Sequence, residues 1–147
     1  MNSYIETVIS SRRFRVLPKD SKLLLVQLIS TCNPAGVFPF DPDYLKFQLG
    51  LDNVIDSIED LKSGQWAFFD EDSGEGISFE YLSHNNPYKS STKQQQRYVF
   101  DRKNVKSKPI SKKLMDMDKR LRESAKERLD VPKEVVKAGP LNYHVDK

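Results

Sequence analysis

Residues 52–82 read DNVIDSIEDLKSGQWAFFDEDSGEGISFEYL, and this stretch decides the fold. Its first third has the apolar spacing of an amphipathic helix. Asp52 is placed to cap the start of this helix, and Gly64 is placed to end it in a left-handed conformation. The residues predicted to face inward lie at i, i+1, i+4 and i+7, and they are Val54, Ile55, Ile58 and Leu61.

The second part of the stretch has the pattern of a β-hairpin. Residues 66–69 and 77–81 are rich in aromatic and β-branched side chains, and they flank the polar residues 70–76. The glycines and the Ser-Gly pair of this polar segment are typical of a turn. A helix followed by a two-stranded hairpin is the second half of a winged helix-turn-helix.

The preceding residues supply the first half. We expect an extended or single-turn segment over residues 1–18, a central core helix over residues 19–31 and a short edge strand over residues 37–40. Asp41 and Pro42 predict the start of the next helix, which stops at Gly50. Its predicted inward residues are Tyr44, Leu45 and Leu49. The aromatic residues expected to pack in the core or on the hairpin are Tyr44, Phe47, Trp66, Phe68 and Phe79.

The rest of the chain is predicted to be an extension. Residues 89–113 are polar and basic with little periodicity, which predicts a linker or arm. An amphipathic helix is expected over residues 114–131, ended by Pro132, and a flexible tail over residues 132–147. The predicted class is therefore α+β and mainly α, with a winged helix-turn-helix over residues 1–88 and a basic C-terminal extension containing one helix.

Charge is divided unequally along the chain. The formal net charge is +3. Residues 37–82 contain eleven acidic and two basic residues, whereas residues 83–147 contain eight acidic and seventeen basic residues. This division predicts an acidic folded part and a basic extension, which suits a polyanionic partner.

Several functional classes find no support in the sequence. No run approaches about 18 consecutive apolar residues, so we expect no membrane span, and we expect no secretory signal. One cysteine, Cys32, fits a reducing cytoplasm, and it is expected to be a small buried residue. His84 and His144 are far apart without a cysteine cluster, and no phosphate loop or nucleophile motif occurs, so we expect no enzyme, no metal and no cofactor.

Several segments resemble a known family. They are LPKDSKLLLVQLIST at residues 17–31, AGVFPF at 35–40, DPDYLKFQLGL at 41–51, VIDSIEDLKSGQWAFFDEDSG at 54–74 and YLSHNNPYKSSTKQQQ at 81–96. Over residues 14–96 the chain is similar to the N-terminal winged-helix domain of phage and prophage replication-initiation (replisome-organiser) proteins. The resemblance implies DNA binding in replication initiation and partners such as a helicase or its loader. Two features depart from the family pattern: the third helix is acidic, and the chain is short for a second domain.

The predicted DNA-binding residues form three groups. Basic side chains attract phosphates irrespective of sequence, and the exposed side of a third helix can enter the major groove. The groups are Arg12, Arg13 and Arg15; Asn53, Ser57 and Lys62 on the third helix; and Lys89, Lys93, Arg97, Arg102, Lys103, Lys106 and Lys108 in the extension, continued by Lys112 and Lys113. Tyr88, Tyr98 and Phe100 lie among the last group and could stack on unpaired bases.

Alternatives remain open for each group. The arginines could pair with the acidic part of the chain, the acidic third helix could face a protein partner, and the extension could be a solvated linker. The leading hypothesis is a winged-helix protein that binds single- or double-stranded DNA in phage or prophage replication initiation. The alternatives are a protein-interaction winged helix that uses its acidic surface, with self-association as a homodimer left open, and a winged-helix transcriptional regulator.

Overall fold

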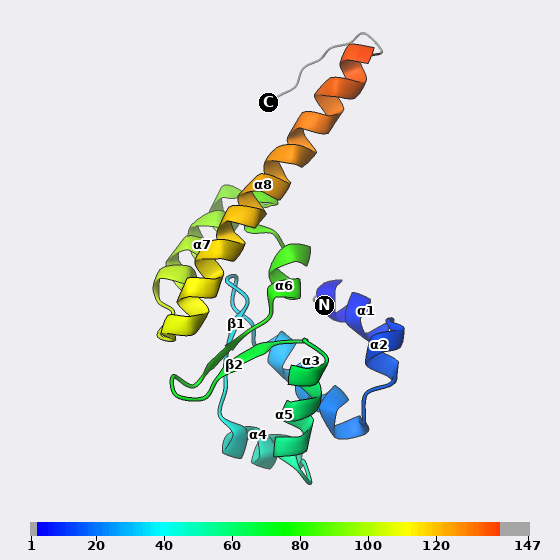
Figure 1. Ribbon diagram of the computed structural model, residues 1–147, viewed down its shortest axis with the longest axis vertical. Helices are drawn as coiled ribbons and strands as arrows, with labels where there is room; N and C mark the ends of the chain where they lie inside the picture. Colours follow the sequence, from blue (N-terminus) through cyan, green and yellow to red (C-terminus); the bar gives the residue numbers. More distant parts are fainter. Residues whose placement is uncertain (1–2, 139–147) are drawn as a thin grey trace.

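The computed structural model describes the backbone of residues 3–138 and the side chains of residues 3–126. The chain is mainly helical, at 65%, with a small three-stranded antiparallel sheet, which places it in the α+β class (Figure 1). The elements in chain order are α1 (Ser3–Ile9), α2 (Arg12–Arg15), α3 (Lys19–Ser30), β1 (Val37–Pro39), α4 (Pro42–Leu49), α5 (Val54–Ser63), β2 (Phe68–Asp70), β3 (Glu75–Ile77), α6 (Phe79–His84), the 3-10 turn η1 (Pro87–Lys89), α7 (Thr92–Lys103) and α8 (Lys108–Ala138).

The helix over residues 54–63 is confirmed and ends before Gly64 as predicted, but its N-terminal cap and the conformation of Gly64 differ from the prediction. Asn53, not Asp52, caps α5, because its side chain accepts the backbone N–H of Asp56 at 3.1 Å. Gly64 has a right-handed conformation with φ −80°, and the left-handed residue is Gln65 with φ 56°. Ile55 is exposed rather than inward, because the buried face of α5, formed by Val54, Ile58 and Leu61, does not extend around the helix as far as Ile55.

The sheet has the strand order β1-β3-β2. Side chains alternate across a strand, so neighbouring residues enter different cores. Phe38 and Phe69 face the helices α3 and α5, whereas Val37 and Ile77 face the opposite side. The second hairpin strand is shorter than predicted: Ser78 caps a helix instead, accepting the N–H of Tyr81 at 3.2 Å.

Two hydrophobic cores therefore lie on the two faces of the sheet. The first contains Tyr4, Val8, Phe14, Leu24, Leu25, Leu28, Ile29, Phe38, Phe40, Leu45, Leu51, Val54, Ile58, Leu61, Trp66 and Phe69. The second contains Ala35, Val37, Ile77, Leu82, Tyr98, Ile110, Leu114, Met117 and Leu121. More than half of the second core comes from α7 and α8, so this helical hairpin covers the outer face of the sheet.

The prediction of an arm over residues 89–113 is wrong in structure. Most of it is α7 and the first turns of α8, because Tyr98 and Ile110 anchor an otherwise polar segment on the sheet. The predicted helix 114–131 begins earlier, at Lys108, and continues past Pro132. Of the predicted tail 132–147, the first residues are helical, and residues 139–147 lie outside the described residues.

Two further predictions are corrected near the N-terminus and on α4. Residues 1–18 were expected to be extended or a single turn, yet α1 and α2 form there and bury Tyr4, Val8 and Phe14 in the first core. Tyr44 and Phe47 were expected to pack inward, yet both are exposed on α4. Leu45 alone of that helix is fully buried, because a short helix presents only one narrow face to α3 and α5.

Candidate nucleic-acid interface

The outward face of α8 carries a row of five basic side chains and one methionine. Its members are spaced alternately four and three residues apart, which places them on one side of a helix. They are Lys108, Lys112, Met115, Lys119, Arg122 and Lys126, all of them exposed. At 1.5 Å per residue the row is about 27 Å long. We call these six residues the basic stripe.

The outward face of α7 adds a second basic surface beside an exposed aromatic ring. Lys93, Arg97 and Phe100 lie at i, i+4 and i+7, and the Phe100 side chain is 66% exposed. Together with Gln96 and Asp101 they line a shallow hollow of about 430 Å³. Burial raises the pKa of Asp101, and the Arg97 charge opposes that rise. We call Lys93, Gln96, Arg97 and Phe100 the α7 face.

A buried carboxylate joins α7 and η1 to α8. The hydroxyls of Tyr88 and Tyr98 donate to Asp118 Oδ1 at 2.6 and 2.7 Å. Its Oδ2 atom accepts a hydrogen bond from Arg122 Nε at 3.0 Å and forms an ion pair with Arg102 at 3.1 Å. Burial by itself would raise the pKa of Asp118, but the hydrogen bonds from the two tyrosines and Arg122, with the Arg102 charge, outweigh burial and lower it.

The predicted cations of the extension thus divide into two sets. Arg102 pairs with Asp118 inside the hairpin, and only 22% of its side chain is exposed. Tyr88 and Tyr98 are likewise committed to Asp118 and are not free to stack on a base. The exposed predicted cations are Lys89, Lys93, Arg97, Lys103, Lys106 and Lys108.

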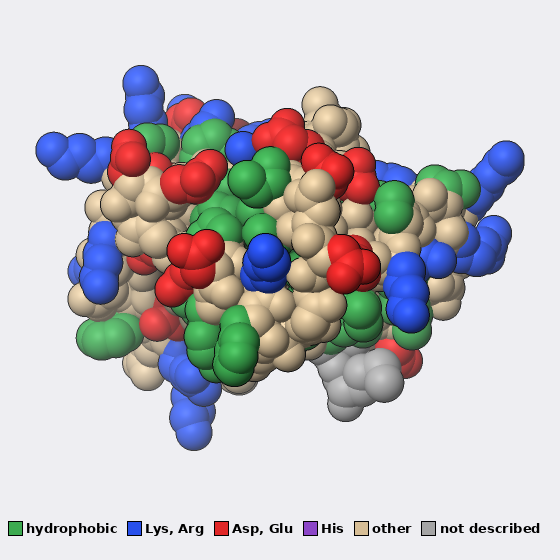
Figure 2. All heavy atoms as spheres, turned by 90° about the horizontal axis from the view of Figure 1, so that it is seen from below, with side chains coloured by type: hydrophobic (Ala, Val, Ile, Leu, Met, Phe, Trp, Pro, Cys, Tyr) green, Lys and Arg blue, Asp and Glu red, His purple; other side chains and the backbone are tan. Residues whose placement is uncertain are grey.

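The predicted third-helix residues do not form a basic surface. Asn53 is committed to capping α5, and Ser57 is buried with its hydroxyl donating to the Asn53 carbonyl at 3.3 Å. Lys62 lies 3.4 Å from Glu59 and 3.9 Å from Glu71. Viewed from this end of the molecule, acidic and hydrophobic side chains gather near the centre, and most Lys and Arg side chains lie toward the edge (Figure 2).

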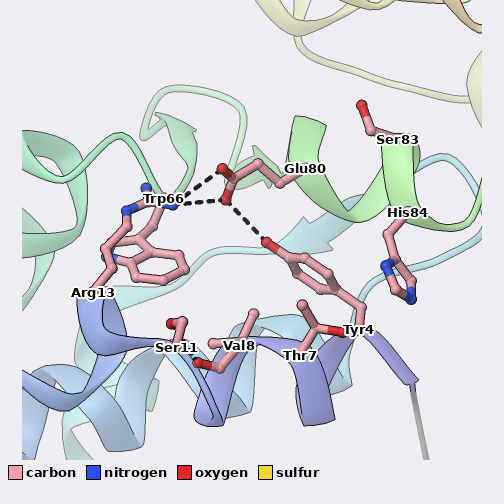
Figure 3. A pocket seen from close by; sticks show the side chains of 9 residues that line it. All are labelled: Tyr4, Thr7, Val8, Ser11, Arg13, Trp66, Glu80, Ser83 and His84. Atoms are coloured by element: carbon pink, nitrogen blue, oxygen red, sulfur yellow. Dashed lines mark hydrogen bonds and ion pairs between the residues drawn. The ribbon is translucent and has the colours of Figure 1, made fainter.

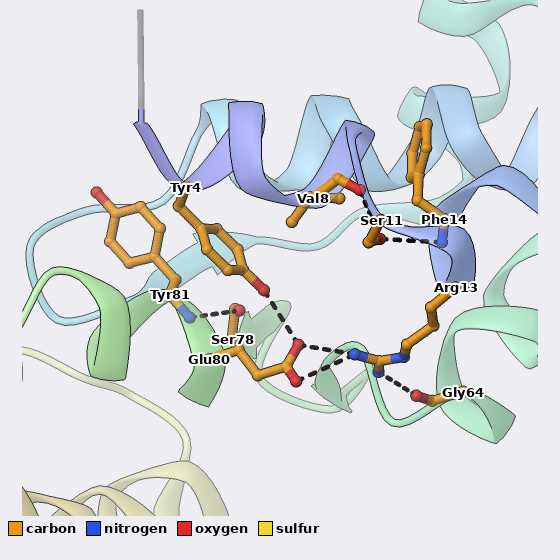
Figure 4. Close-up of polar contacts among 9 residues, drawn as sticks. All are labelled: Tyr4, Val8, Ser11, Arg13, Phe14, Gly64, Ser78, Glu80 and Tyr81. Atoms are coloured by element: carbon orange, nitrogen blue, oxygen red, sulfur yellow. Dashed lines mark hydrogen bonds and ion pairs between the residues drawn. The ribbon is translucent and has the colours of Figure 1, made fainter.

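Arg13 is held by contacts within the protein, as the alternative reading allowed. Its guanidinium stacks 3.6 Å from the Trp66 ring centroid and pairs with Glu80 at 3.0 Å (Figure 3). It also donates to the Gly64 carbonyl, while Tyr4 donates to the same Glu80 carboxylate at 3.1 Å (Figure 4). The contacts line a pocket of about 420 Å³ and fasten α1 and α2 to α6. Arg12 and Arg15 remain exposed.

The turn between β2 and β3 is fastened to the start of α8. Glu75 Oε1 accepts the backbone N–H groups of Lys106 at 3.0 Å and Ser107 at 2.7 Å. A hydrogen bond from Ser107 lowers the pKa of Asp70. Carboxylates are favourable at a helix N-terminus, so the acidic turn helps to orient the basic helix.

Sequence reasoning missed four members of the basic stripe: Met115, Lys119, Arg122 and Lys126. The four-and-three spacing is visible in the sequence once α8 is extended back to Lys108. Because the helix was predicted to start at Leu114, Lys108 and Lys112 fell in a predicted arm, and the spacing that continues from them was not recognised.

Other chemistry is limited in the part of the chain that the structure describes. No three His, Cys, Asp or Glu side chains there are arranged to hold a metal ion. Burial raises the pKa of the Cys32 thiol to about 12, so this thiol stays protonated near neutral pH. None of the described helices is both long and apolar enough to span a membrane. The chain matches no family model, no curated protein and no solved structure.

Proposed function

We propose that the chain is a winged helix-turn-helix protein that binds DNA through the basic stripe and the α7 face. The order α3-β1-α4-α5-β2-β3 and the strand order β1-β3-β2 support the winged-helix assignment, with the β2–β3 hairpin as the wing. In this proposal α5, which is the third helix of the winged-helix unit after α3 and α4, does not read DNA, because its exposed carboxylates would repel phosphates.

The observation that carries the proposal is the basic stripe. Four exposed lysines, with Arg122 that also pairs with Asp118, form one row about 27 Å long, which matches an extended polyanion better than a compact anionic ligand. The row is fixed in direction because Glu75 holds the start of α8 and Asp118 holds its middle. A row on a formed helix loses less backbone conformational entropy on binding than the flexible arm expected from the sequence.

The biological role is proposed from the resemblance to replication-initiation proteins. Such a protein would act in the host cytoplasm at the start of phage or prophage DNA replication. The basic surface would hold DNA while a helicase or its loader is recruited by another part of the assembly.

Neutralising two stripe residues, as Lys112→Gln with Lys119→Gln, should weaken DNA binding and reduce its salt dependence. Each phosphate contact contributes about 0.9 to the slope of log affinity against log salt on duplex DNA, so the slope should fall by about 2. The measurement is a salt titration by fluorescence anisotropy with labelled duplex and single-stranded oligonucleotides. The intact chain is required, because Tyr98 and Leu114 belong to the second core.

The matched control is Lys19→Gln with Lys46→Gln, which removes the same charge from exposed positions outside both basic surfaces. Its slope should stay close to that of the unaltered protein. An unaltered protein that shifts no DNA at low salt would overturn the DNA-binding proposal. Equal effects of the two double variants would instead show that only net charge matters.

Phe100→Ala should weaken binding to single-stranded DNA about fivefold and leave duplex binding nearly unchanged. Stacking of an unpaired base on an aromatic ring is worth about 1 kcal/mol or more, and a duplex does not offer its base faces. Phe47→Ala, an exposed phenylalanine on α4, is the control and should change neither affinity. A similar loss on both DNA forms would exclude base stacking as the role of Phe100.

A further inference from the structure

The end of the molecule formed by α4 and α5 exposes large apolar side chains. Phe47 is 86% exposed, Tyr44 58% and Ile55 67%. Two aromatic rings three residues apart on one helix are costly to leave in water and typical of a contact surface. The exposed carboxylates of these two helices and the residues beside them are Asp41, Asp43, Asp52, Asp56 and Glu59. We call this acidic, apolar surface the acidic pole; it lies within the face shown in Figure 2.

The opposite end of the molecule has the complementary character. Helix α8 starts beside the sheet and extends away from α4 and α5 (Figure 1). Its basic stripe contains Met115, whose side chain is 67% exposed among four lysines and an arginine. Methionine adapts its shape readily to an aromatic partner. The stripe therefore offers positive charge to the exposed carboxylates of the acidic pole and an apolar contact to its exposed aromatic rings.

We propose that the acidic pole of one copy docks on the basic stripe of a second copy, head to tail. Within one chain the two surfaces lie at opposite ends, so they can meet only between molecules. Phe47 and Tyr44 would contact the Met115 region, while carboxylates of the pole would face the stripe lysines. Because the two surfaces differ, the contact is heterologous, and it continues from copy to copy rather than closing as a dimer.

The acidic pole and DNA would bind the same stripe and therefore compete for it. Only this competition rests on the proposed function. An oligonucleotide bound to the stripe would displace the neighbouring acidic pole, so DNA would dissociate the chains of copies. The association itself is independent of DNA and is measured without it. Charge attraction across the contact should also make it weaken as salt screens the surfaces.

The test uses sedimentation velocity on the full chain at low and high salt. The unaltered protein should increase in mass beyond a dimer as its concentration rises at low salt, and it should return to monomer at high salt. The pole variant Tyr44→Lys with Phe47→Lys and the stripe variant Lys112→Glu with Lys119→Glu should each remain monomeric. All four positions are exposed, and urea unfolding of each variant verifies that the fold is kept.

Mixing the two monomeric variants gives the deciding result. The pole variant keeps an intact stripe and the stripe variant keeps an intact pole, so an equimolar mixture should form a complex of twice the monomer mass and nothing larger. Failure of this mixture to associate, or a monomeric unaltered protein at its highest soluble concentration, would overturn the proposal. A pole variant that still associates alone would identify a different surface.

The DNA proposal and the association proposal can fail separately. The pole variant keeps both basic surfaces intact and no longer covers the stripe of a neighbouring copy, so it should bind DNA at least as tightly as the unaltered protein. Association without DNA binding would leave the head-to-tail contact standing and remove only the competition. DNA binding without association would overturn the head-to-tail contact and leave the DNA-binding proposal standing.

Discussion

Asp118→Ala is expected to lower the free energy of unfolding by about 3 kcal/mol, because removing one partner of a buried ion pair leaves the others uncompensated. The lost carboxylate would strand two tyrosine hydroxyls, those of Tyr88 and Tyr98, and the half-buried Arg102 guanidinium. Equilibrium unfolding in urea measures the loss. Asp116→Ala, an exposed carboxylate on the same helix, should change the unfolding free energy by less than about 0.5 kcal/mol.

The pH dependence of stability provides an independent check on Asp118. Its pKa is lower in the folded protein than in the unfolded chain, so its contribution is complete above the unfolded value of about 3.9. As the pH falls below that value and through the folded pKa, the contribution is lost. The difference in stability between the unaltered protein and Asp118→Ala should therefore shrink only in acid. A difference that stays constant from neutral pH to pH of about 2 would contradict a role for the charge.

Gly36→Ala should destabilise the protein by about 3 kcal/mol, from a backbone penalty of about 1–2 kcal/mol and a steric clash of similar size. Gly36 has φ +76°, and a Cβ there would lie 2.9 Å from the Ser78 carbonyl oxygen and 3.0 Å from Leu82 Cγ. The neighbours cannot easily move, because the Ser78 N–H donates to the Gly36 carbonyl at 2.9 Å and Leu82 is fully buried.

Gly50→Ala separates the two causes of this loss. Gly50 also has a positive φ, +65°, but an added Cβ would meet no heavy atom within 4 Å. Its replacement should cost only the backbone penalty, about 1 kcal/mol. Urea unfolding of both variants gives the comparison. Equal losses at the two glycines would show that close packing around Gly36 contributes nothing.

Several elements could be predicted from the sequence because their signals are local. Asp41 and Pro42 mark the start of α4, and Gly50 ends it in the left-handed conformation expected of glycine. The dense apolar residues between Leu23 and Ile29, interrupted only by Gln27, predict a core helix, and α3 is confirmed there. Caps, proline, glycine and dense apolar runs act through a few neighbouring residues, so they can be recognised without knowledge of the fold.

The helical hairpin of α7 and α8 depends on tertiary contacts. Tyr98 is one of three adjacent apolar residues, Tyr98-Val99-Phe100, and Ile110 lies among polar residues, so local periodicity does not show that these two are the ones buried. They are buried because alternate residues of β1 and β3 leave a second apolar face on the sheet, which α7 and α8 cover. The same tertiary contacts bring Tyr88 and Arg102 to Asp118.

The division of charge and the order of the central elements follow from the sequence alone, because composition and local signals do not depend on the fold. Which residues of each element face outward was decided by packing. Three residues expected to be buried are exposed to solvent: Ile55, Tyr44 and Phe47. A helix can bury only the face that its neighbours cover. The basic stripe likewise exists only because the sheet and Asp118 hold α8 with that side outward.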